Sequence, residues 1–138
     1  MQAWKVHKFG GSSVADAACM QRVAEIIEGD PVSRKAVVLS ACRGVTDALL
    51  NLVTLAEQQD AALDDRIEAL RQRHIGIARE LLAGDLYDEF LVELDRDCHD
   101  IAGILQPVRL VRAASTTLRD LIAGYGELYS VFRTNHNT

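Results

Sequence analysis

The stretch VHKFGGSSVADA, from Val6 to Ala17, decides how this chain is expected to fold. An apolar segment runs into Gly10 and Gly11, two serines follow, and a helical pattern begins directly afterwards. In this order of strand, glycine turn and helix, backbone N–H groups can face an anion, and glycine lets it approach closely. Lys8, on the expected strand, adds a charge that suits a phosphate. The stretch matches neither GxxxxGK(S/T) nor GxGxxG, so it predicts an anion site or simply a tight turn before a capped helix.

The composition is typical of a single globular domain, with 138 residues, of which 49% are apolar and 25% charged. The net charge of −5 argues against nucleic acid or an anionic membrane as the main partner. The sequence has no apolar run of about 18 residues, and the apolar part of its first eleven residues is too short to be expected to act as a signal peptide. Cys19, Cys42 and Cys98 are odd in number and widely spaced. They favour small buried residues over a disulfide or metal framework, in a reduced, cytoplasmic setting.

Hydrophobic periodicity predicts two strands, at residues 4–10 and 35–41, with a helix between them. The second strand is apolar enough to be covered on both faces. Ser13, with Asp16 three residues later, is the expected cap of the helix, which ends at residues 29–31. This order is typical of a right-handed βαβ unit with parallel strands.

After residue 41 the chain is expected to be almost wholly helical. Three helical patterns span residues 49–56, 67–81 and 86–105, and Pro107 is expected to close the third. A last helix begins near residue 117, where Thr117 and Asp120 have capping-box spacing, and its pattern is lost in the polar residues 133–138.

The expected sheet is too small to stand alone, because a two-stranded parallel sheet leaves faces and edges that four helices cannot cover. We therefore expect residues 1–138 to form a single partial domain, one half of a larger α/β domain. In isolation, the chain is expected to form a homo-oligomer through exposed apolar surface.

A second loop, LSACRGVTDALL at residues 39–50, follows the second strand with small residues and a helix start. Because the carboxyl ends of parallel strands meet at one edge of a sheet, Ser40 and Thr46 are expected beside Lys8 and the glycine turn. On the last helix, Glu127 is expected opposite the apolar stripe, close to Gly124 and Gly126. Each glycine weakens a helix by about 1 kcal/mol relative to alanine, which suggests a close approach at this face. The alternative is an ordinary solvated glutamate.

Three motifs together resemble the first half of an aspartokinase, over nearly the whole chain: KFGGSSV, VVLSACRGVTDALL and GYGELYS. The resemblance implies the first half of the three-layer αβα amino-acid kinase fold, with a short parallel sheet and a helix-rich second part. It implies transfer of the ATP γ-phosphate to the side-chain carboxylate of L-aspartate, on the way to lysine, threonine and methionine. Mg²⁺ would accompany the ATP. The chain could come from an enzyme that fuses aspartokinase to diaminopimelate decarboxylase.

The resemblance also implies roles for individual residues. Lys8 would neutralise the transferring phosphoryl group, and the phosphate-cradling turn would consist of Gly10, Gly11 and Ser12, the last replacing a typical threonine. The residues that would hold aspartate are Ser40, Thr46 and Glu127, with Glu127 taking the ammonium group. Such a site is chemically coherent, because phosphoryl transfer depends more on positioning and charge neutralisation than on a protein nucleophile.

Parts of the family pattern are missing from this sequence, namely the nucleotide-binding half and the regulatory ACT domains. The chain alone is therefore expected to be inactive. His74 lies on an apolar stripe, which favours a packed core histidine, and Arg43 could contact substrate or solvent. The alternatives are a kinase of another acidic substrate, a truncated paralogue acting as an interaction module, and a fragment without a function of its own.

Overall fold

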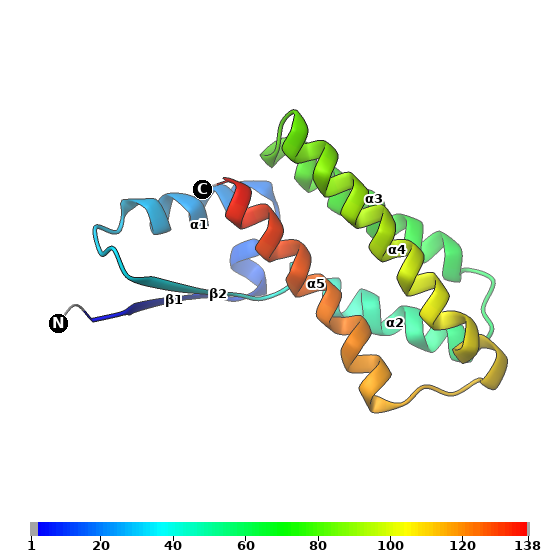
Figure 1. Ribbon diagram of the computed structural model, residues 1–138. Helices are drawn as coiled ribbons and strands as arrows, with labels where there is room; N and C mark the ends of the chain where they lie inside the picture. The colour runs from blue at the N-terminus through cyan, green and yellow to red at the C-terminus, as the bar shows by residue number, and fades with distance from the viewer. Residues whose placement is uncertain (1–2, 138) are drawn as a thin grey trace.

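The computed structural model describes the backbone of residues 3–137 and the side chains of residues 3–127 (Figure 1). The elements in chain order are β1 (Lys5–Phe9), the 3₁₀ turn η1 (Gly11–Val14), α1 (Ala17–Gly29), β2 (Lys35–Leu39), α2 (Val45–Glu57), α3 (Leu63–Leu81), α4 (Asp85–Val111) and α5 (Thr116–Asn137). The predicted order of a strand–helix–strand unit followed by four helices is confirmed.

The strands β1 and β2 pair in parallel, in register from Lys5 with Lys35 to Phe9 with Leu39. Figure 1 shows that α1, which connects the two strands along the chain, lies beside the sheet, as expected for a βαβ unit. Phe9 and Leu39 pack against the core.

The opposite face of the sheet is open in the described part of the chain. Val6 is 64% exposed and Val38 50% exposed. The prediction that the second strand is covered on both faces is therefore wrong for the described residues. Successive side chains of a strand point to opposite faces, and here only one face meets the helices.

Both predicted helix caps were placed on the wrong residue. The carboxylate of Asp16 caps α1 and accepts a hydrogen bond from the Cys19 N–H at 2.8 Å. Residues 11–14 form the 3₁₀ turn, so the helix starts too late for Ser13 to cap it. The Ser115 hydroxyl caps α5 and accepts from the Leu118 N–H at 3.1 Å, so the helix begins near the predicted position but Thr117 is not its cap.

The predicted end of α4 at Pro107 is also wrong, because the helix continues to Val111. Proline lacks the N–H that would bond to Gly103 and normally disrupts a helix interior. Leu105 and Val108, on either side of Pro107, are buried in the core, so packing holds the last turn in helical form. The backbone of α5 likewise stays helical through the polar residues 133–137, where the sequence pattern predicts the helix to be lost.

The four helices after the sheet all contribute to the main hydrophobic core, and α3 and α4 form a second cluster around Phe90. Figure 1 shows α3 and α4 side by side as a hairpin, and Arg71 of α3 pairs with Asp95 of α4 at 2.6 Å. Arg119 of α5 pairs with Glu57 of α2. His74 is fully buried and its Nδ1 donates to the Leu70 carbonyl at 2.8 Å, which confirms a packed core histidine. Within the described residues, no helix combines the length and apolar character that crossing a membrane requires.

Candidate functional site

The glycine turn after β1 contains two glycines in different surroundings. The backbone at Gly10 is extended, and its carbonyl accepts from the Ser13 N–H at 3.0 Å, which closes the turn. A Cβ on Gly11 would lie 3.2 Å from the Ala41 carbonyl oxygen, whereas one on Gly10 would meet nothing within 4 Å. A side chain at Gly11 would therefore crowd the second loop. Gly10 leaves its backbone open to an approaching ligand.

The side chains expected to meet a phosphate are accessible. Lys8 lies in register with Val38, and both are exposed on the open face of the sheet. Ser12 is exposed in the turn. A cavity of about 190 Å³ opens beside Ser12 and is also lined by Arg22 of α1. Arg22, which the sequence reading missed, adds a second positive charge near the turn.

The second loop lies directly against the first. The Ser40 N–H donates to the Phe9 carbonyl at 3.1 Å, which joins the ends of the two strands. Gly44 has a φ of 80°, in the left-handed region that favours glycine, and α2 begins one residue later. Thr46 is exposed in the first turn of α2. The predicted meeting of the two loops is confirmed, while the ligand roles of Ser40 and Thr46 stay predictions.

The last helix packs closely on this second loop. A Cβ on Gly126 would lie 2.9 Å from Val45 Cγ1 and 3.0 Å from Ala41 Cβ. The expected close approach is therefore real at Gly126, and the approaching group is the chain itself. Gly124 has no such neighbour within 4 Å. Glu127 follows Gly126 and is exposed, so it lies one residue along α5 from the contact with the second loop.

A contact from α3 supports the second loop. Arg73 Nη2 donates to the Arg43 carbonyl at 2.6 Å. The Arg43 side chain itself is exposed. The sequence reading missed Arg73, since thirty residues separate it from the loop and no local pattern links them.

The start of β1 is anchored through Asp30, just after α1. Its carboxylate pairs with Lys5 at 2.6 Å, accepts from the Val32 N–H at 3.0 Å and lies 3.0 Å from His7 Nε2. Lys5 above all, then the Val32 N–H, lowers the pKa of Asp30 to about 2. This cluster holds the strand that carries Lys8.

Neither Cys19 nor Cys98 is activated for nucleophilic chemistry. Burial raises the pKa of Cys98 to about 11, and the hydrogen bond with Asp16 raises the pKa of Cys19. Cys42 is buried. Among the described residues, no group of three or more His, Cys, Asp or Glu side chains could hold a metal ion.

Comparison with known proteins extends this picture. A family model described as the amino acid kinase family matches residues 3–129. A bifunctional aspartokinase/homoserine dehydrogenase 2 of Arabidopsis thaliana is 37% identical over 129 residues, which are 94% of this chain and 14% of that protein. The lysine-sensitive aspartokinase 3 of Escherichia coli K12 is 33% identical over 125 residues, 91% of this chain and 26% of that enzyme.

Solved structures of E. coli aspartokinase III are similar to this chain. The enzyme in complex with aspartate and ADP superimposes with a TM-score of 0.81 at 31% identity, covering 98% of this chain and 28% of that one. The complex with lysine and aspartate superimposes with a TM-score of 0.82 at 30% identity, covering 99% of this chain and 29% of that one. These matches confirm the predicted fold class. They also mean that this chain spans under a third of each of these relatives.

Proposed function

Since the chain belongs to the amino acid kinase family, we propose that it forms part of an aspartate kinase. The proposed reaction is transfer of the ATP γ-phosphoryl group to the side-chain carboxylate of L-aspartate. The observation that carries the proposal is the meeting of three segments at the carboxyl ends of β1 and β2. The glycine turn contacts the second loop at Gly11, and α5 contacts the same loop at Gly126. A similar fold in an enzyme solved with aspartate and ADP supports it further.

The proposed phosphate side of the site consists of Lys8 and the glycine turn. Lys8 is exposed one residue before the end of β1 and would place its ammonium group on the transferring phosphoryl group. The open backbone at Gly10 and the exposed hydroxyl of Ser12 would contact phosphate oxygens, with Gly11 holding the turn against the second loop.

The proposed aspartate side consists of Ser40, Thr46 and Glu127. The Glu127 carboxylate would pair with the ammonium group of the substrate, and the two hydroxyls would donate hydrogen bonds to its carboxylates. Orientation of this kind can lower the barrier by about 7–11 kcal/mol when the reacting atoms are held in line. Mg²⁺ as the companion of ATP stays a prediction, as does fusion to a diaminopimelate decarboxylase.

We further propose that these residues form the N-terminal portion of an amino-acid kinase domain, whose remainder covers the open face of the sheet. Val6 and Val38 expose apolar side chains there, beside Lys8. The chain alone should therefore associate with itself and show little or no kinase turnover. Light scattering that finds a monodisperse monomer would contradict the first expectation. Replacing Val6 and Val38 by threonine should reduce the association.

The function is tested in a chimera in which this chain replaces the matching segment of E. coli aspartokinase 3. We expect ADP release that depends on L-aspartate, that is lost in Lys8→Ala and that is not supported by L-glutamate. Glu127→Gln should raise the KM for aspartate at least tenfold, because one charged pair is lost. Asp120→Asn, which removes an exposed carboxylate from the same helix, should leave it unchanged.

A separate binding measurement tests the aspartate pocket even if the chimera does not fold. The chain itself is titrated with L-aspartate by NMR, and amide shifts should gather at residues 10–12, 40–46 and 126–127. Shifts elsewhere only, or equal shifts with Glu127→Gln, would argue against the proposed aspartate pocket. Activity with another acidic substrate would favour a different kinase on the same fold.

A further inference from the structure

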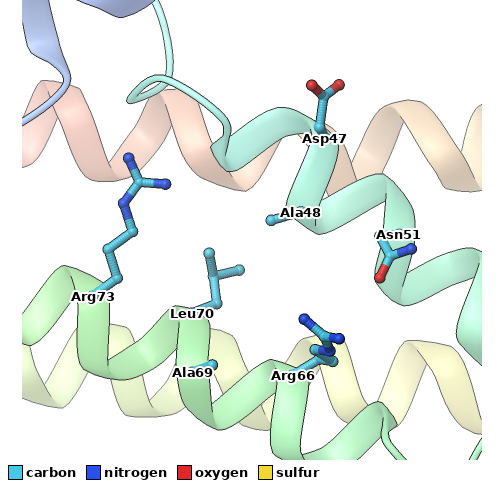
Figure 2. A pocket seen from close by; sticks show the side chains of 7 residues that line it. All are labelled: Asp47, Ala48, Asn51, Arg66, Ala69, Leu70 and Arg73. Atoms are coloured by element: carbon cyan, nitrogen blue, oxygen red, sulfur yellow. The ribbon is translucent and has the colours of Figure 1, made fainter.

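A second cavity, of about 390 Å³, lies between α2 and α3 (Figure 2). Arg66 and Arg73 reach it from α3, and Asn51 of α2 lies near Arg66. Ala48 and Leu70 face each other across its apolar middle. None of the residues proposed above to bind phosphate or aspartate lines this cavity. The proposed kinase site therefore does not account for it.

The two arginines give the cavity a positive character. They are seven residues apart on one helix, hence about two turns or about 10 Å along the same face. Within residues 3–127, neither guanidinium forms an ion pair. By contrast, Arg71 on the same helix pairs with Asp95 at 2.6 Å and Glu68 at 3.1 Å. Asp47, the acidic residue at the rim, points away from the cavity in Figure 2.

We propose that this cavity binds a small organic dianion. Its two anionic groups, carboxylate or phosphate, pair with Arg66 and Arg73, since guanidinium matches the geometry of both. Its short carbon chain lies on Leu70 and Ala48. The cavity volume falls at the lower end of the range for small-molecule sites, about 300–1,000 Å³.

Arg73 connects this cavity to the second loop. The hydrogen bond from its Nη2 to the Arg43 carbonyl, at 2.6 Å, uses one of five guanidinium donors, and others remain for a ligand. A bound anion therefore restrains Arg73 and, through it, the loop that leads into α2. This inference needs only the cavity and its two arginines, and it stands whether or not the chain serves a kinase.

The test is an NMR titration of the isotope-labelled chain, at fixed ionic strength, with the dicarboxylates from succinate to suberate. The matching monocarboxylates serve as comparison ligands. We expect saturable shifts along the facing parts of α2 and α3 and at Gly44, with one preferred chain length. Arg66→Gln and Arg73→Gln should each weaken binding about tenfold, because each removes one charged pair.

Arg79→Gln is the matched control. It removes the same charge from the same helix, at an exposed residue outside the cavity, and should bind as tightly as the unchanged chain. Equal binding of monocarboxylates, an equal loss in Arg79→Gln, or no saturable shift would each overturn the proposal. Arg66 has no described side-chain partner, so Arg66→Gln keeps the test valid even if Arg73→Gln unfolds the chain.

Discussion

Replacing Gly126 by alanine should destabilise the chain relative to the same change at Gly124. Both glycines lie inside α5, where alanine is favoured by about 1 kcal/mol. At Gly126 the added Cβ would lie 2.9 Å from Val45 Cγ1, 3.0 Å from Ala41 Cβ and 3.4 Å from Leu49 Cδ1. Overpacking of this kind costs about 1–3 kcal/mol. The net effect of Gly126→Ala is then between neutral and a loss of about 2 kcal/mol.

Gly124→Ala is the matched control, because its Cβ would meet nothing within 4 Å. It should gain the full helical preference of about 1 kcal/mol. Urea unfolding of both variants measures the free energy of unfolding, with unchanged slopes showing that the unfolded states are comparable. We expect Gly126→Ala to be less stable than Gly124→Ala by about 1–3 kcal/mol. Equal stabilisation by the two changes would refute the close packing of α5 on the second loop.

Three further predictions concern the turn, the anchor of β1 and the thiols. Gly11→Ala should speed hydrogen exchange in the second loop, because its Cβ would lie 3.2 Å from the Ala41 carbonyl, whereas Gly10→Ala should not. The pKa of Asp30 is lowered from 3.8 to about 2, so its stabilising contribution is complete above about pH 4 and is lost as pH falls towards 2. Urea unfolding between these pH values should show a smaller loss in Asp30→Asn than in the unchanged chain. With a pKa of about 11, Cys98 should react with a thiol reagent at pH 8 at least tenfold more slowly in the folded than in the urea-unfolded chain.

The meeting of the glycine turn and the second loop could be predicted from the sequence. Two apolar segments separated by one helix imply parallel strands, and their carboxyl ends must then share one edge. Connectivity alone therefore places Ser40 and Gly11 at that edge. This inference succeeds because it depends on chain connectivity and handedness rather than on the details of packing.

Helix ends were predicted less well. Ser13 and Asp16 are both good capping residues, as are Ser115 and Thr117, and several starts are nearly equal in local energy. The 3₁₀ turn at Gly11–Val14 delays the start of α1, so Asp16 rather than Ser13 becomes its cap. At Pro107, burial of neighbouring side chains outweighs the usual effect of proline, and the sequence alone does not reveal how deeply they are buried.

By itself, the sequence determined the order of the elements and the position of the glycine turn. Those features follow from local preferences and periodicity, which act over a few residues. Only the tertiary structure decided that Gly126 packs on Val45, that Arg73 holds the Arg43 carbonyl, and that Arg66 and Arg73 share a cavity. These pairs depend on the angles and distances at which helices pack, and those are set by side chains distant in the chain, acting together.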